Sequence, residues 1–181
     1  MLAANDAELV ARAQGGDVDA VGELYDAHHE HIFRYVWSRV RDKQLAEDLT
    51  GETFTRMVGN LAGYRLTDVP FRAWLYRIAR NLIVDHYRTE NGRTSLPLSY
   101  AEDTGSGGSH PSPIVEQKLV LESVQEALAQ IDPLQREVIL LRFVTGLPLQ
   151  EVALALDKTV AAVKALQHRG LKSLRVVLQQ V

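Results

Sequence analysis

The residue types best suited to holding a metal lie in the run His28-His29-Glu30-His31, with Asp26 just before it. Imidazole and carboxylate groups could hold zinc and activate a water molecule for hydrolysis. A helical zinc site of that kind needs two histidines four residues apart on one face and a third ligand. His28 and His31 are only three residues apart, and adjacent residues point in different directions. His28 also falls on an apolar stripe, so we expect a packed core histidine and no metal site. An enzyme is therefore the least favoured hypothesis for this chain.

Residues 71–88, FRAWLYRIARNLIVDHYR, combine arginines with aromatic side chains. At helical spacing Arg72, Tyr76 and Arg80 share one face, while Trp74 points toward an expected core. Guanidinium groups bind phosphates, and aromatic rings stack on bases, so this face suits single-stranded nucleic acid.

Residues 148–172 have the pattern of a helix-turn-helix. Asp157-Lys158 form the expected turn, and Thr159 is the expected cap of the second helix. Between positions 158 and 175 there are five Lys or Arg residues and no carboxylate, which suits the major groove of duplex DNA and its phosphates. An ordinary amphipathic helix with a solvated basic face is the alternative. The side chains expected to face inward from the second helix are Val160, Val163, Leu166 and Leu171.

The chain has 181 residues with no cysteine and a net charge of −3, which excludes disulfides and thiolate chemistry and favours a reducing compartment. A mildly acidic total is unusual for a nucleic-acid binder. The charge is divided into blocks, however, of −5 over residues 1–60, +3 over 61–95, −5 over 96–134 and +4 over 135–181. Two basic zones therefore stand beside two acidic ones, which suggests different partners for different surfaces.

The apolar spacing predicts helices over residues 18–40, 45–61, 68–87, 114–131 and 132–144 in addition to the helix-turn-helix, and no strand. Asp68 is the expected cap of the third helix with Pro70 in its first turn, and Gly146 is the expected stop after 144. Residues 91–113 contain four Gly, three Pro and five Ser, as in a flexible linker. We expect an all-α protein with two small helical domains, 1–90 and 114–181. With no signal peptide and no apolar run long enough to span a membrane, it should be cytoplasmic.

Three segments together resemble the extracytoplasmic-function (ECF) group of bacterial RNA polymerase sigma factors. They are AEDLTGETFTRM at 46–57, FRAWLYRIARNLIVDHYR at 71–88, and LQREVILLRFVTGLPLQEVALALDKTVAAVKALQHRGLKSLR at 134–175. Their order and the linker between them match the family. The resemblance implies a sigma region 2 bundle in the first domain and a sigma region 4 helix-turn-helix in the second.

The resemblance also assigns roles to individual residues. In the family, the first matching segment docks on a coiled coil of the large polymerase subunit, and the residues implied here are Asp48, Leu49, Glu52, Phe54 and Arg56. The loop from Tyr64 to Phe71 matches the one that receives a base flipped from the non-template strand of the −10 element, and the next helix reads and separates that element. The residues implied for the −10 element are Tyr64, Arg65, Asp68, Phe71, Arg72, Tyr76, Arg77, Arg80, Asn81, Asp85 and Arg88.

The second domain would read the −35 element as duplex DNA. The residues expected to contact it are Lys158, Thr159, Lys164, Gln167, His168, Arg169 and Lys172. Family members commonly have Gly where this chain has Asp157, and polar or basic residues where it has Ala161, Ala165 and Leu166. Direct base readout at −35 is therefore expected to be sparse, with phosphates and DNA shape contributing more. The chain ends at Val181, so we expect no accessory C-terminal domain.

The implied partners are core RNA polymerase, promoter DNA and an anti-sigma factor, with no cofactor and no catalytic step. The runner-up hypothesis is a two-domain helix-turn-helix regulator that works without polymerase. It predicts tight, specific duplex binding by the isolated chain, whereas a sigma factor should bind DNA weakly until core polymerase is added.

Overall fold

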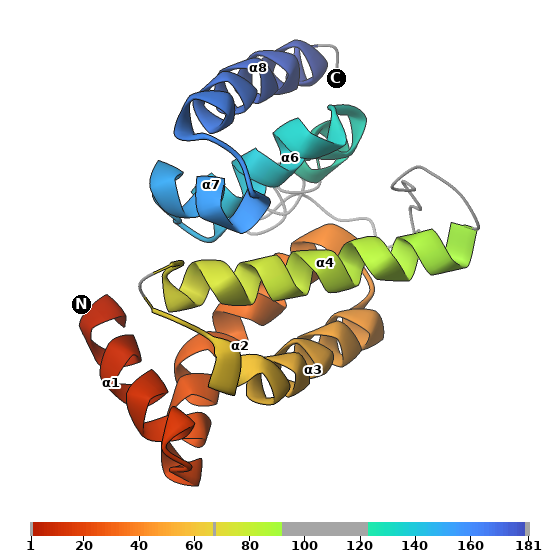
Figure 1. Ribbon diagram of the computed structural model, residues 1–181. Helices are drawn as coiled ribbons and strands as arrows, with labels where there is room; N and C mark the ends of the chain where they lie inside the picture. The colour runs from red at the N-terminus through yellow and green to blue at the C-terminus, as the bar shows by residue number, and fades with distance from the viewer. Residues whose placement is uncertain (1, 67, 92–122, 180–181) are drawn as a thin grey trace, which may run out of the picture.

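The computed structural model describes residues 2–66, 68–91 and 123–179, and every regular element in this part of the chain is helical, as predicted (Figure 1). The predicted linker lies, apart from Asn91, outside the described residues, as does the first half of the helix predicted over 114–131. The described part of that predicted helix, residues 123–130, is helical. None of the described helices has both the length and the apolar character needed to cross a bilayer. The first group of helices comprises α1 (Leu2–Gln14), α2 (Val18–Val40), α3 (Lys43–Asn60), the short 3-10 helix η1 (Leu61–Gly63) and α4 (Phe71–Asn91).

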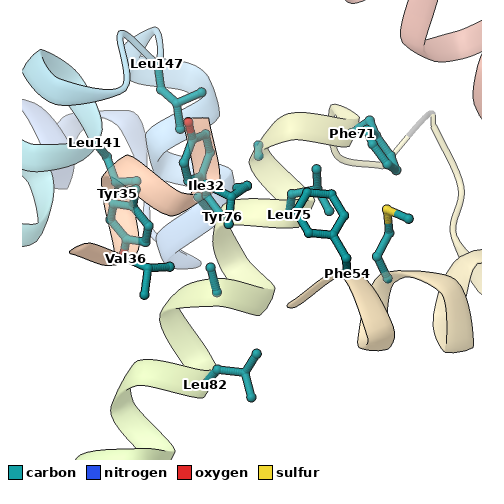
Figure 2. Packing of buried hydrophobic residues seen from close by; sticks show 14 of the residues in the cluster. Ile32, Tyr35, Val36, Phe54, Phe71, Leu75, Tyr76, Leu82, Leu141 and Leu147 are labelled. Atoms are coloured by element: carbon teal, nitrogen blue, oxygen red, sulfur yellow. The ribbon is translucent and has the colours of Figure 1, made fainter. Parts of the chain in front are cut away.

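The C-terminal group comprises α6 (Pro133–Ile139), the π-helical turn η2 (Leu140–Val144), α7 (Leu149–Leu156) and α8 (Val160–Leu178). Within the first group, which is the N-terminal one, α4 packs against α2 and α3 on one side and faces α7 of the C-terminal group on the other (Figure 1). Figure 2 shows Leu141 and Leu147 of the C-terminal group beside Tyr35 and Tyr76 of the N-terminal group. The two domains therefore share one apolar core in this arrangement.

Side-chain caps explain where several helices begin. Asp17, Asp42 and Asp132 accept backbone N–H groups in the first turns of α2, α3 and α6. The predicted cap Thr159 is confirmed, since its hydroxyl accepts the N–H of Ala162 at 3.1 Å. The start of α4 is different from the prediction: Pro70 lies before the helix, and its carbonyl accepts the first helical hydrogen bond, from Trp74 N at 3.0 Å.

Two turns of the C-terminal domain have left-handed backbone. Gly146 has φ +72° just after η2 and ends that helix, as predicted. Asp157 closes α7 with φ 54°. Because left-handed backbone is easiest for glycine, a glycine would fit the position of Asp157 with less strain.

The inward face of α8 differs from the prediction at one position. Leu171 is 41% exposed, whereas Val163, Leu166 and Gly170 are buried. The buried residues follow a spacing of three and four, which keeps them on one side of the helix. Gly170 lies against α6, and a Cβ added to it would stand 2.9 Å from Ile139 Cδ1 and 3.3 Å from the Gln135 carbonyl oxygen.

Gly170→Ala should therefore destabilise the packing of α8 on α6, by about 1–3 kcal/mol in the free energy of unfolding. Gly22→Ala is the matched control, because a Cβ at Gly22 in α2 would meet nothing within 4 Å. The control should stabilise the chain by about 0.5–1 kcal/mol, since alanine is the better helix former. Urea denaturation measures the free energy of unfolding of both variants. Changes of the same sign in the two variants would contradict the close approach of Gly170 to α6.

Candidate nucleic-acid interface

The outer face of α8 is the first candidate surface for DNA. Most of the side chains predicted to contact −35 DNA are exposed on it or on the turn before it: Lys158, Thr159, Lys164, His168, Arg169 and Lys172. Gln167 is half-buried and its Oε1 accepts a hydrogen bond from Arg142 Nε at 3.1 Å. Ala161 and Ala165 are exposed on the same helix and offer only methyl groups, whereas Leu166 is buried. Of the three apolar residues from which sparse base readout at −35 was predicted, only the two alanines are exposed.

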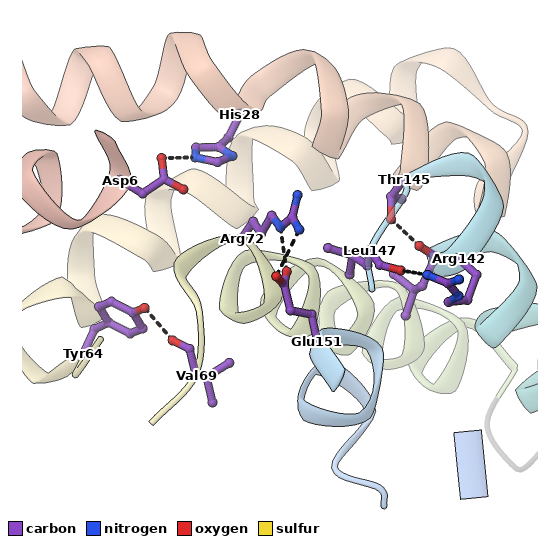
Figure 3. Close-up of polar contacts among 10 residues, drawn as sticks. Asp6, His28, Tyr64, Val69, Arg72, Arg142, Thr145, Leu147 and Glu151 are labelled. Carbon is purple, nitrogen blue, oxygen red and sulfur yellow. Dashed lines mark hydrogen bonds and ion pairs between the residues drawn. The ribbon is translucent and has the colours of Figure 1, made fainter. Parts of the chain in front are cut away.

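The second candidate surface, on α4, is covered by the C-terminal domain. Arg72 donates two hydrogen bonds to the Glu151 carboxylate of α7, from Nε at 2.6 Å and from Nη2 at 3.0 Å (Figure 3). Arg77 donates to the carbonyl oxygen of Leu154. A forked pair of this kind is how arginine also binds phosphate, so Glu151 occupies a position suited to a DNA phosphate.

A cavity separates the next turn of α4 from the end of α7. Arg77, Arg80 and Asn81 line it from α4, and Ala155, Leu156 and Asp157 line it from the C-terminal domain. Three side chains predicted to read the −10 element therefore face the second domain. Asp85 and Arg88, farther along α4, are exposed.

Tyr76 is buried at the contact between the domains. Its side chain is 4% exposed and packs edge-on against Tyr35, with ring centroids 5.3 Å apart. Burial raises the pKa of Tyr76 to about 12, so its hydroxyl stays neutral. In this arrangement Tyr76 is unavailable for stacking on a base, because the C-terminal domain covers it.

A buried polar triad joins the domains beneath this contact. Arg39 of α2 lies 3.1 Å from the Glu137 carboxylate of α6, and both side chains are 3% exposed. Tyr35 donates its hydroxyl hydrogen to the same carboxylate. Burial and the charge of Glu137 raise the pKa of Tyr35, which keeps that hydroxyl protonated as a donor. Neither Glu137 nor Glu151 was identified from the sequence, because their partners lie roughly 80 to 100 residues away.

The loop before α4 brings together three aromatic rings. Tyr64 stacks on Trp74 with centroids 4.5 Å apart, and Phe71 meets both rings at 5.7 and 5.8 Å. Tyr64 and Phe71 are buried, whereas Trp74 is half-buried and Arg65 and Asp68 are exposed. Trp74 packs against the core, as expected, and is half-buried there. The Tyr64 hydroxyl donates to the Val69 carbonyl at 2.6 Å (Figure 3).

The residues predicted to dock on polymerase divide into two groups on α3. Asp48, Glu52 and Arg56 are exposed, with Glu52 and Arg56 paired at 3.0 Å. Leu49 and Phe54 are 8% and 5% exposed and belong to the core. These two residues therefore support the surface of α3 from inside, and their contact with polymerase stays a prediction.

Two histidines of the run, His28 and His29, pack against other side chains of the N-terminal domain. Within the described residues no group of three His, Cys, Asp or Glu side chains is placed to hold an ion. His28 is buried, as expected, and its Nε2 lies 2.9 Å from Asp6 Oδ1. His29 packs against the rings of Tyr25 and Phe33.

Two segments of the chain match models of known protein families. Residues 24–93 match the family model for sigma-70 region 2, and residues 127–176 match that for sigma-70 region 4. The ECF RNA polymerase sigma factor BldN of Streptomyces coelicolor is 36% identical over 171 residues, which are 94% of this chain and 65% of the relative. The chain thus spans just under two thirds of that relative.

Two further comparisons extend over most of both proteins. The ECF RNA polymerase sigma factor SigX of Bacillus subtilis is 33% identical over 156 residues, which are 84% of this chain and 80% of the relative. The solved structure of CnrH in complex with the cytosolic domain of CnrY matches with a TM-score of 0.76 at 26% identity, covering 97% of this chain and 98% of that one. This chain belongs to the sigma-70 family, among the ECF RNA polymerase sigma factors.

Proposed function

We propose that this chain binds core RNA polymerase and directs promoter-specific initiation, with α4 and the loop before it acting at the −10 element and α8 at the −35 element. The observation that carries the proposal is the pair of basic surfaces on α4 and α8, each in a segment that matches a sigma-70 region. The proposed domains are residues 1–90 and 114–181. No catalytic step is needed from the chain, because stacking and pocket contacts to an extruded base, worth about 1–3 kcal/mol each, capture transient openings.

Initiation requires the domains to move apart. While Glu151 holds Arg72 and α7 covers Arg77, these two side chains of α4 cannot contact DNA. Core polymerase would separate the domains if it binds the N-terminal domain and holds the C-terminal domain elsewhere. This mechanism explains how a chain with two basic surfaces could bind DNA weakly by itself.

The other implied partners follow from the same surfaces. An anti-sigma factor would inhibit the protein by occupying its polymerase-binding or DNA-binding faces, and CnrH, whose fold this chain shares, has been solved in complex with another protein. The site of action would be the cytoplasm, where polymerase and promoter DNA meet.

Run-off transcription tests the function directly. Core polymerase with this chain should start transcription at defined promoters in DNA from its own genome, whereas core alone should not. Gel shifts with and without core polymerase distinguish the proposed function from the runner-up hypothesis of a regulator that acts without polymerase. Tight, specific duplex binding without core, unchanged when core is added, would favour that hypothesis and overturn the proposal.

Asp48→Arg tests the docking surface on α3. The substitution reverses a charge on an exposed side chain, so we expect roughly tenfold weaker binding to core with the fold intact. Leu49→Arg is unsuitable because Leu49 is buried. Glu8→Arg, at an exposed position of α1, makes the same charge change away from α3 and should bind core normally. The affinity of each variant for core polymerase is measured by fluorescence anisotropy. Equal affinity of the Asp48 variant and wild type would refute this docking surface.

A further inference from the structure

Helix α1 contacts the start of the loop that precedes α4. The Gln14 side-chain amide donates to the carbonyl oxygens of Leu61 and Tyr64, at 2.9 and 2.7 Å. Both hydrogens of the amide are therefore used on one short stretch of backbone. Tyr64 is held twice, since its carbonyl is bound by α1 and its hydroxyl is bound to Val69 O at 2.6 Å.

The same helix supports the end of that loop through a buried pair. Asp6 of α1 lies 2.9 Å from His28 of α2, and both side chains are buried (Figure 3). The His28 ring packs edge-on against Phe71, with centroids 5.4 Å apart. Phe71 is the first residue of α4, so α1 reaches the end of the loop through His28.

The contacts made by Gln14 and by the Asp6–His28 pair both reach the aromatic cluster of Tyr64, Phe71 and Trp74. The ring centroids of these residues lie 4.5 to 5.8 Å apart, and Trp74 is the member that reaches the surface. Any displacement of Tyr64 or Phe71 would change the shape of that surface, because closely packed rings move together. Helix α1 lies wholly before residue 24, where the match to sigma-70 region 2 begins, so that match assigns it no role.

We propose that α1 is a positioning element for the base-receiving loop, with Gln14 and the Asp6–His28 pair fixing the aromatic cluster that discriminates one −10 base from another. This inference rests on the proposed function. Small displacements of a binding surface reduce selectivity more than overall binding, since every base can still stack but only one fits the pocket. Gln14 and Asp6 would therefore affect which base is accepted without contacting it.

The test uses the full chain reconstituted with core polymerase. Rates of open-complex formation are measured on two duplex promoters that differ only at the flipped −10 base, and on a third whose −10 region is pre-melted by mismatches. The variants are Gln14→Glu, which keeps the size and removes both donors, and Gln14→Leu, which removes them without adding charge. Gln14 is exposed, so both variants should fold. Glu8→Gln, exposed on the same helix, is the matched control.

The ratio of rates on the two duplex promoters should fall roughly tenfold in both Gln14 variants and stay unchanged in the control. Core affinity should stay at the wild-type value, and the melting temperature should fall only slightly. An unchanged ratio, or an equal loss on all three templates, would overturn the inference. If wild-type holoenzyme does not initiate at all, the proposed function fails instead, so the two failures are distinguishable.

Discussion

Replacing Glu137 by alanine should separate the two domains of the free chain. The substitution leaves Arg39 and Tyr35 buried without their carboxylate partner at the domain contact. Breaking a buried ion pair by removing one partner costs about 3–5 kcal/mol. Most of this cost is avoided if the domains open and Arg39 reaches water, so the open arrangement is favoured.

Domain separation can be measured by fluorescence transfer, because the chain has no cysteine to interfere with labelling. Dyes on cysteines introduced at Glu8 and Val176, both exposed, report on the two domains. Transfer efficiency should change in Glu137→Ala and stay constant in Glu126→Ala, which removes an exposed carboxylate from the second domain. The free Glu137 variant should also bind promoter DNA roughly tenfold or more tightly, since α4 is uncovered.

The triple variant Tyr35→Phe, Arg39→Met and Glu137→Met removes all three polar members of the triad and provides the stricter control. Replacing both partners of a buried pair by apolar residues of similar volume is often neutral or stabilising. This variant should keep the closed arrangement and the weak DNA binding of wild type. If Glu137→Ala leaves the transfer efficiency and the DNA affinity unchanged, the triad does not hold the domains together.

Arg80→Ala and Asn81→Ala should slow open-complex formation on duplex promoters by roughly 10- to 100-fold, about 1.4 to 2.7 kcal/mol of transition-state stabilisation. Both side chains face the cavity between α4 and α7, so they become free to contact DNA when the domains separate. The Arg80 Nε is buried and has no hydrogen-bond partner among the described residues. A buried donor of this kind gains a partner on moving to a DNA phosphate or base edge.

Pre-melted promoters separate opening from affinity. If the two residues act in strand separation, their loss should have little effect on templates that are already open. Equal losses on duplex and pre-melted templates would instead assign them to binding alone. Lys43→Ala, which removes an 81% exposed cation at the start of α3, should leave both rates unchanged.

The contact between the domains pairs arginines of the N-terminal domain with acidic residues of the basic C-terminal block. Arg72 of one basic block binds Glu151, and Arg39 binds Glu137, although both carboxylates belong to the basic C-terminal block. These are two of the three acidic residues between 135 and 181. The three acids between 135 and 181 therefore lie on the side turned toward the N-terminal domain, and the outer face of α8 has no carboxylate.

The alternation of apolar residues and the positions of Asp, Thr, Pro and Gly were enough to predict the main helices from α2 onward, the turn at Asp157 and the outward basic face of α8. These features depend on contacts within a few residues, which a single sequence displays directly. The N-terminal helix α1 has the same kind of pattern, with Leu9, Val10 and Ala13 buried, and could have been found the same way. Its role could not, because Gln14 bonds to carbonyls 47 and 50 residues away.

Only the tertiary structure determined which polar groups find each other and which are covered. Tyr76 and Arg72 have the composition of a nucleic-acid surface, but packing of α7 on α4 buries the first and pairs the second with Glu151. Leu49 and Phe54 likewise became core residues through the packing of α3. A partner selected from a distant segment depends on how whole helices pack, and the free energy of that packing is spread over the shared core. Local spacing therefore determined the helices and the types of surface, and long-range packing determined which of those surfaces is open.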